Sequence, residues 1–199
     1  MVSKTRERLI EVARQLFLKK GVENTTMNDI ATASEKGRRT IYTYFKNKRE
    51  IFNAVIEQQS ELVIGELREA AEADAEPLVK LERYLSLRFR LLEDFHIRSE
   101  RTRFFFRGDH RRFTKILQLI MDKERAIMQA MMEEGVAAGA FDPVQAQRLP
   151  SLELMLSRGI DLSRLADSQS AQGVIHDSLR HDIIEFIIEG IRNKSNVQS

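Results

Sequence analysis

Apolar residues recur at intervals of three and four positions along most of the chain, which is the spacing of one face of an α-helix. The first such segment covers residues 3–21 and ends on two lysines and a glycine, a typical helix C-terminus. A second, short segment begins at Thr26, a third covers about 37–45, and a long one opens at Asn47. The pattern predicts three short helices followed by a long one.

Two capping signals support the predicted helix starts. Thr26 is followed three positions later by Asp29, a variant of the capping box, and Asn47 is followed by Glu50 in the same way. The two short helices between these signals are too small to bury a core alone, so they need the first helix as a third wall. Residues 26–45 therefore indicate a helix-turn-helix.

The third predicted helix has a polar outer face. Ile41 and Phe45 lie four positions apart and are expected to point inward, with Tyr44 near the boundary. Arginines, hydroxyls and an aromatic ring remain outside, and these groups can contact base edges and phosphates in a DNA major groove. The alternative is a polar surface that contacts only water. The outer set is Arg38, Arg39, Thr40, Tyr42 and Thr43.

Further helices are predicted beyond residue 63. Pro77 starts one, 112–139 forms a long one, and Asp142 followed by a proline caps the next. Pro150 is expected to kink or break that helix. A final apolar helix ends near Ile191, after a polar stretch at 167–173.

Two features of this region leave alternatives open. Residues 88–112 hold eight arginines and the run 104–106 of three phenylalanines. The arginines could line a site for an anionic effector, but a basic surface around a buried aromatic cluster is favoured. The four methionines of 112–139 could form an adaptable pocket wall, but ordinary core is favoured.

Charge is distributed unevenly, although the net charge of the chain is only +2. Residues 1–62 carry twelve basic and eight acidic side chains, and 36–49 carry six basic ones and no acid. A local basic segment on a nearly neutral chain indicates one surface that binds a polyanion, against the alternative of a solvated charged face.

Composition excludes several classes of function. With 42 % hydrophobic residues the chain can bury a core, and without cysteine it has no disulfide, thiolate metal site or thiol catalysis. The four histidines lack the spacing of a helical metal pair, and no glycine-rich phosphate loop is present. We expect no cofactor, no metal site and no enzymatic activity. Without a signal peptide or a membrane-spanning stretch, we expect a soluble, intracellular protein.

The N-terminal third resembles the DNA-binding region of the TetR family of bacterial transcriptional regulators. The resemblance covers about 3–63 and includes the glycine after the first helix, the pairs Thr25-Thr26 and Ile30-Ala31, and the run TIYTYFKNK at 40–48. It implies that seven positions contact DNA. These positions are Thr26, Arg38, Arg39, Thr40, Tyr42, Tyr44 and Lys48. The helix starts at Thr26 and Lys48 are also expected to bind phosphate, because amide donors and positive charge meet there.

The turn of the helix-turn-helix departs from the family pattern. That pattern has glycine first, where this chain has Glu35, Lys36 and then Gly37. Either Glu35 adopts a left-handed backbone conformation at a cost of about 1 kcal/mol, or the turn is rearranged around Gly37.

These observations combine into one hypothesis. We expect an all-α homodimer with a helix-turn-helix DNA-binding domain at 3–63 and a helical dimerisation and effector-binding domain at 64–199. The resemblance implies dimerisation through the last two long helices, a near-palindromic operator, a small-molecule effector of unknown identity, and a cytoplasmic repressor. The alternative is a helical protein-interaction module with a degenerate DNA-binding head.

Overall fold

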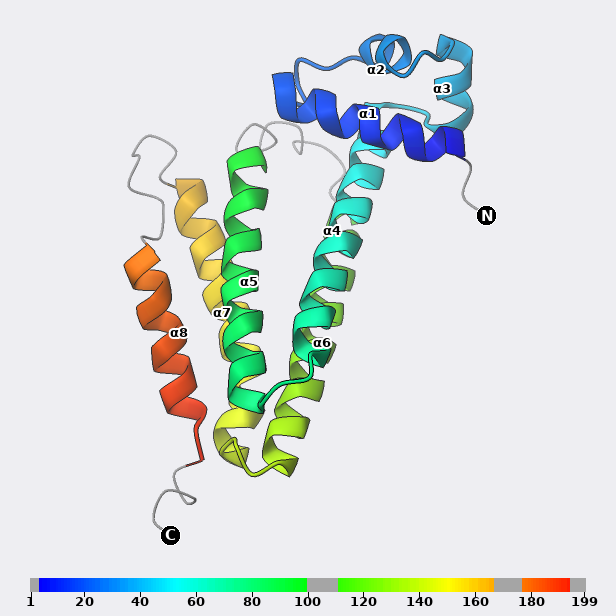
Figure 1. The fold of residues 1–199 in the computed structure, drawn as a ribbon. Helices are drawn as coiled ribbons and strands as arrows, with labels where there is room; N and C mark the ends of the chain where they lie inside the picture. The colour runs from blue at the N-terminus through cyan, green and yellow to red at the C-terminus, as the bar shows by residue number, and fades with distance from the viewer. Residues whose placement is uncertain (1–3, 100–110, 167–176, 194–199) are drawn as a thin grey trace. The chain divides into compact units, whose positions relative to one another are not determined.

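The structure, a computed structural model, describes residues 4–99, 111–166 and 177–193. These residues form eight α-helices and no strand, which confirms the predicted all-α fold (Figure 1). None of these helices is long and apolar enough to cross a membrane. The helices are α1 (Lys4–Lys20), α2 (Met27–Ala33), α3 (Arg38–Tyr44), α4 (Lys48–Glu72), α5 (Pro77–Ser99), α6 (Arg111–Ala137), α7 (Pro143–Ala166) and α8 (Asp177–Ile191).

The chain divides into two compact units. The first contains the described residues of Met1–Leu62 and Arg98–Leu117, and the second those of Val63–Ile97 and Gln118–Ser199. The boundary near residue 62 falls inside α4, which is continuous from Lys48 to Glu72.

The first unit packs α1, α2, α3 and the start of α4 around a small apolar core. Phe17 of α1 and Phe52 of α4 meet with ring centroids 5.9 Å apart. Ile41 is fully buried and Phe45 is 3 % exposed, as the spacing on the third helix predicts. The other large buried side chains of this core include Leu9, Ile10, Ile30 and Ile51.

The second unit has its own core, built from α4 to α8. Its buried cluster includes Tyr84 and Leu85 of α5, Leu149 of α7 and Ile184 of α8. Three of the four α6 methionines belong to this core, in agreement with the favoured interpretation. They are Met128, Met131 and Met132, each at most 4 % exposed.

The connection between α6 and α7 is held by backbone bonds to the end of α8. Asp142 donates its amide to the Ile191 carbonyl at 2.8 Å, and Asn193 donates to Ala140 at 2.9 Å. The Asp142 carboxylate also accepts the amides of Val144 and Gln145 at 3.0 and 2.9 Å. It therefore caps α7, as the Asp142-proline pair predicts.

Of the two outcomes expected at Pro150, a kink or a break, the break is wrong. Helix α7 continues through this residue from Pro143 to Ala166. Proline removes the amide hydrogen bond to Ala146, but Ala146, Leu149 and Pro150 are all buried. Tertiary packing on both sides of the proline therefore outweighs the local cost.

Two parts of the sequence interpretation fall outside the described residues. They are the phenylalanine run 104–106 and the polar stretch 167–173. The side chains of the arginines after Arg90 in 88–112 also lie outside. Arg88 is described, and its guanidinium pairs with the buried Glu124 carboxylate at 3.1 Å inside the second unit.

Candidate nucleic-acid interface

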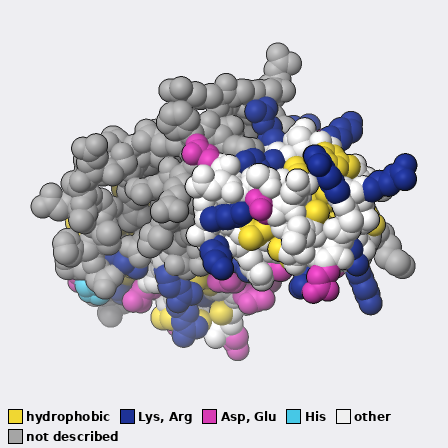
Figure 2. Space-filling view, turned by 90° about the horizontal axis from the view of Figure 1, so that it is seen from above, with side chains coloured by type: hydrophobic (Ala, Val, Ile, Leu, Met, Phe, Trp, Pro, Cys, Tyr) yellow, Lys and Arg dark blue, Asp and Glu magenta, His cyan; other side chains and the backbone are white. Residues whose placement is uncertain are grey.

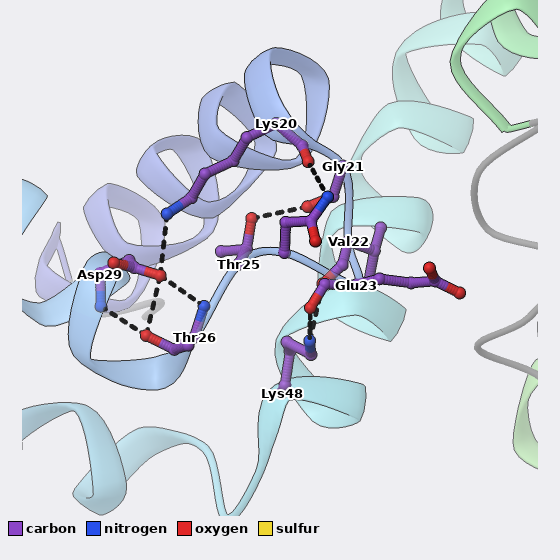
Figure 3. A network of polar contacts seen from close by, with 9 residues as sticks. Lys20, Gly21, Val22, Glu23, Thr25, Thr26, Asp29 and Lys48 are labelled. Atoms are coloured by element: carbon purple, nitrogen blue, oxygen red, sulfur yellow. Dashed lines mark hydrogen bonds and ion pairs between the residues drawn. The ribbon is translucent and has the colours of Figure 1, made fainter.

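The start of α2 is fixed by a reciprocal capping box. The Thr26 hydroxyl accepts the Asp29 amide at 3.1 Å, and the Asp29 carboxylate accepts the Thr26 amide at 2.7 Å and its hydroxyl at 2.8 Å. Lys20, at the end of α1, pairs with the same carboxylate at 2.9 Å (Figure 3). The capping signal is confirmed, and the single hydroxyl proton of Thr26 is engaged with Asp29.

Because of this network, the stability of the first unit is expected to fall when the pH becomes strongly acidic. The Lys20 ammonium, followed by the Thr26 amide and hydroxyl, lowers the pKa of the Asp29 carboxyl from 3.8 to about 2. Since folding lowers this pKa, the ionised carboxylate stabilises the fold above about pH 4 and loses that contribution as the pH falls toward about 2. We expect Asp29→Asn to lower the urea midpoint at neutral pH, and the difference from wild type to shrink between about pH 4 and 2. A difference that stays constant over this range would refute the role of the Asp29 charge.

In the turn between α2 and α3, Glu35 has a left-handed backbone conformation. Its φ is 57°, and Gly37 has an ordinary extended conformation at φ −63° as the N-cap of α3. The Lys36 amide donates to Ala31 at 3.0 Å and the Glu35 amide to Thr32 at 3.1 Å, which is the Schellman pattern of a helix end. Of the two expected conformations, the structure has the strained Glu35.

Replacing Glu35 with glycine is expected to stabilise the first unit by up to about 1 kcal/mol, since glycine adopts this φ without a Cβ clash. Chemical unfolding of the purified variant measures the change. Lys36→Gly is the matched control, because the only non-glycine residue with positive φ among the described residues is Glu35. The control should be destabilised, because glycine there loses more backbone entropy on folding. An unfolding free energy of Glu35→Gly below that of wild type would argue against strain at this turn.

Helix α3 exposes the side chains that the sequence places on its outer face. Arg38 and Arg39 are exposed, and Tyr42 is 43 % exposed, while Thr40 and Tyr44 are half-buried. The Arg38 guanidinium lies over the Tyr42 ring, 5.9 Å from its centroid. This contact orders one arginine on the helix surface and leaves its guanidinium edge available for hydrogen bonds.

Lys48 has a structural role that the sequence does not indicate. Its ammonium donates to the backbone carbonyls of Val22 at 2.7 Å and Glu23 at 3.1 Å (Figure 3). Partial burial lowers the pKa of Lys48, and the carboxylates of Glu23 and Asp29 partly offset this. The carbonyls lie 25 and 26 positions earlier in the chain, so no local pattern could have identified them.

The N-terminus of α4 is capped as the sequence predicts. The Asn47 side chain accepts the Glu50 amide at 3.0 Å, and the Glu50 carboxylate accepts the Lys46 amide at 2.8 Å. Together with the Lys48 bonds, these contacts fix the start of α4 against the loop between α1 and α2. The seven predicted DNA contacts thus lie in one compact unit, on the starts of α2 and α4 and along α3.

Positive side chains are numerous on this unit. In Figure 2, Lys and Arg side chains project around the described part of the face, with scattered acidic and hydrophobic side chains between them. The Arg39 carbonyl accepts the Thr43 hydroxyl at 3.1 Å, but the Arg39 guanidinium makes no hydrogen bond or ion pair with another residue that the structure describes. A small helix-turn-helix with exposed arginines on its second helix is typical of proteins that contact base edges in the DNA major groove.

Comparison with known proteins also assigns a DNA-binding helix-turn-helix to this part of the chain. A family model described as bacterial regulatory proteins of the tetR family matches residues 9–55. An uncharacterized HTH-type transcriptional regulator, YhgD of Bacillus subtilis, is 28 % identical over 139 residues, covering 68 % of this chain and 71 % of its own. The probable acrEF/envCD operon repressor of Escherichia coli is 48 % identical over 59 residues, 30 % of this chain and 27 % of that repressor.

Solved structures show the same all-helical fold over most of the chain. The transcriptional regulator FadR from Bacillus subtilis, in complex with stearoyl-CoA, superposes with a TM-score of 0.63 at 21 % identity. The match covers 94 % of this chain and 99 % of FadR. The described helices, the matched family and these relatives agree. Together, the family match over residues 9–55 and these relatives support a TetR-type transcriptional regulator with an N-terminal helix-turn-helix that binds DNA.

Proposed function

We propose that this chain is a repressor that binds a near-palindromic operator through α3. The observation that carries the proposal is the division of α3 between two faces. Ile41 is fully buried and anchors the helix, while Arg38, Arg39 and Tyr42 remain exposed. An arginine can bind guanine with two hydrogen bonds, and a tyrosine can contact a phosphate or a thymine methyl group.

The starts of α2 and α4 are assigned to phosphate contacts. The Lys48 ammonium donates to the Val22 and Glu23 carbonyls, which hold it at the start of α4, and a phosphate contact would add to these bonds. The Thr26 hydroxyl donates to Asp29, so it must turn away from that carboxylate to donate to a phosphate.

The proposed operator-binding form is a homodimer through α7 and α8. These helices expose large apolar side chains in the second unit. Met155 is 71 % exposed and Phe186 is 81 % exposed, and Leu152 and Leu179 are exposed by half or more. Apolar surface of this kind is typical of an interface, and a two-fold dimer would present two α3 helices to successive major grooves.

We also propose that a small molecule regulates DNA binding. The crystal structure of FadR from Bacillus subtilis contains stearoyl-CoA, so the same fold accommodates a ligand in that protein. A ligand that binds one spacing of the two heads more tightly than another shifts the dimer toward that spacing. The proposed place of action is the bacterial cytoplasm, where the DNA is.

Selection of genomic fragments by the purified full-length chain, followed by footprinting, tests the proposal. We expect a protected site with two related half-sites whose centres are about 10 base pairs, or a multiple of that, apart. One or more dimers per site should be seen by native mass spectrometry. Failure to enrich any fragment would contradict the repressor proposal and favour the protein-interaction module.

A further inference from the structure

Arg6 on α1 lies against the residue that ends α3. The carbon at the centre of its guanidinium is 5.3 Å from the centroid of the Phe45 ring, within the range of a cation–π contact. Phe45 is the C-cap of α3 and is 3 % exposed, so the core of the first unit holds its ring in place. Since the ring faces the guanidinium, the Arg6 side chain is held beside the C-terminal end of α3, where Figure 1 shows the start of α1.

The N–H groups of the Arg6 guanidinium have no hydrogen-bond acceptor within the described part of the chain. Arg6 is half-buried, and it makes no hydrogen bond or ion pair with another described residue. The Glu50 carboxylate, which follows Phe45 closely in the chain, instead accepts the Lys46 amide at 2.8 Å. Partial burial keeps water from some of the N–H groups, and a charged acceptor restores the lost hydrogen bonds best. The Arg6 guanidinium is therefore a positioned donor without an anion of its own.

Arg6 lies at the opposite end of α1 from the phosphate contacts proposed for Thr26 and Lys48. Thr26 caps α2 soon after α1 ends at Lys20, and the Lys48 ammonium bonds backbone carbonyls of the same loop. From Arg6 to Lys20, α1 is about 21 Å long. The DNA major groove is about 12 Å wide. With α3 in the groove, contacts at the two ends of α1 are far enough apart to reach the backbones on both sides of it.

We propose that Arg6 binds a phosphate of the DNA backbone beside the C-terminal end of α3, across the groove from the contacts of Thr26 and Lys48. The planar guanidinium presents paired N–H donors that match two phosphate oxygens. Lys46, which is exposed and adjacent to Phe45, adds positive charge near this end of the helix. Arg6 is not among the seven positions that the family resemblance indicates. The inference rests on the proposed DNA binding through α3 and adds a backbone contact to it.

Salt titration of DNA binding by the full-length protein, followed by fluorescence anisotropy with a random-sequence duplex, tests this contact. We expect Arg6→Gln to reduce the slope of log K against log salt concentration by about one phosphate equivalent per bound chain and to weaken binding about threefold or more. Arg6→Lys keeps the charge and should retain most of the slope. The matched control is Arg8→Gln, because Arg8 is exposed and lies about 200° around α1 from Arg6. This control should keep the slope and the affinity of wild type.

Further measurements separate a phosphate contact from a purely structural role. Urea unfolding reports on the Arg6–Phe45 contact, and a loss of stability without a change in slope would assign Arg6 to the fold alone. Arg6→Met keeps the apolar stem over the ring and should show the same reduced slope as Arg6→Gln. Neutral methylphosphonates placed one at a time along the selected operator should locate the contact. Arg6→Gln and Lys48→Ala should each become insensitive at a different position, on opposite strands.

Four results would overturn the proposal. They are an unchanged slope in Arg6→Gln, an equal reduction in Arg8→Gln, loss of discrimination at one base pair instead of uniform weakening, and insensitivity of Arg6→Gln and Lys48→Ala at the same phosphate. Arg6-dependent binding to random DNA without preference for any selected site would refute the repressor proposal and leave the phosphate contact assigned. Absence of binding to any duplex would refute both.

Discussion

Replacing Gly135 with alanine is expected to lower the free energy of unfolding by about 2 kcal/mol or more. A Cβ atom at this position of α6 would overlap the ring of Phe141. That ring is fully buried, and the Phe141 amide donates to the Gly135 carbonyl at 3.1 Å, so the ring cannot move aside cheaply. The helix propensity gained from glycine to alanine, about 1 kcal/mol, is too small to compensate.

Urea unfolding followed by circular dichroism measures this effect. Gly65→Ala on α4 is the matched control, because no atom lies within 4 Å of the added Cβ. The control should be neutral or more stable than wild type by up to about 1 kcal/mol. Combining Gly135→Ala with Phe141→Leu should recover part of the loss relative to the sum of the single variants. Equal stability of Gly135→Ala and wild type would contradict the packing described for the α6–α7 connection.

Replacing Arg39 with alanine is expected to reduce discrimination between the operator and single-base variants about tenfold or more at one position in each half-site. Arg39 is exposed on α3 and its side chain has no partner among the described residues, so its guanidinium is available to a base edge. A bidentate arginine–guanine contact contributes about 1–3 kcal/mol to discrimination. Binding to random DNA should change much less than binding to the operator.

Lys48→Ala provides the contrasting result. We expect it to weaken binding to all sequences to a similar extent and to reduce the salt dependence by about one phosphate equivalent. Because the Lys48 ammonium also binds the Val22 and Glu23 carbonyls, the variant should lose some stability as well. Arg83→Ala, in the second unit, is the control and should leave DNA affinity unchanged. Loss of specificity in Lys48→Ala and uniform weakening in Arg39→Ala would reverse the two roles.

Features encoded by neighbouring residues were predicted well from the sequence. The caps at Thr26 and Asp142 each depend on a side chain and amides within three positions, so short-range patterns identify them. The inward positions Ile41 and Phe45 follow from helical spacing alone. The left-handed conformation of Glu35 was one of two expected at the turn. It was expected because a left-handed residue commonly ends a helix at this position, even where the residue is not glycine.

Features that depend on distant residues could not be predicted. The local rule against proline inside a helix predicts a break at Pro150. Burial of Pro150 and its neighbours on α7 outweighs this local cost, and the helix continues. The bonds of Lys48 join segments more than twenty positions apart, so no local pattern could have indicated them. The roles of the seven predicted DNA-contact residues remain predictions, because they depend on a partner molecule.

The salt dependence of binding to a selected operator and to random DNA of the same length tests the central proposal most directly. We predict that log K falls steeply with log salt concentration for both, by several phosphate equivalents, and that the operator binds about a thousandfold more tightly or better. Equal affinity for the two duplexes, or a flat salt dependence, would contradict sequence-specific DNA binding by α3.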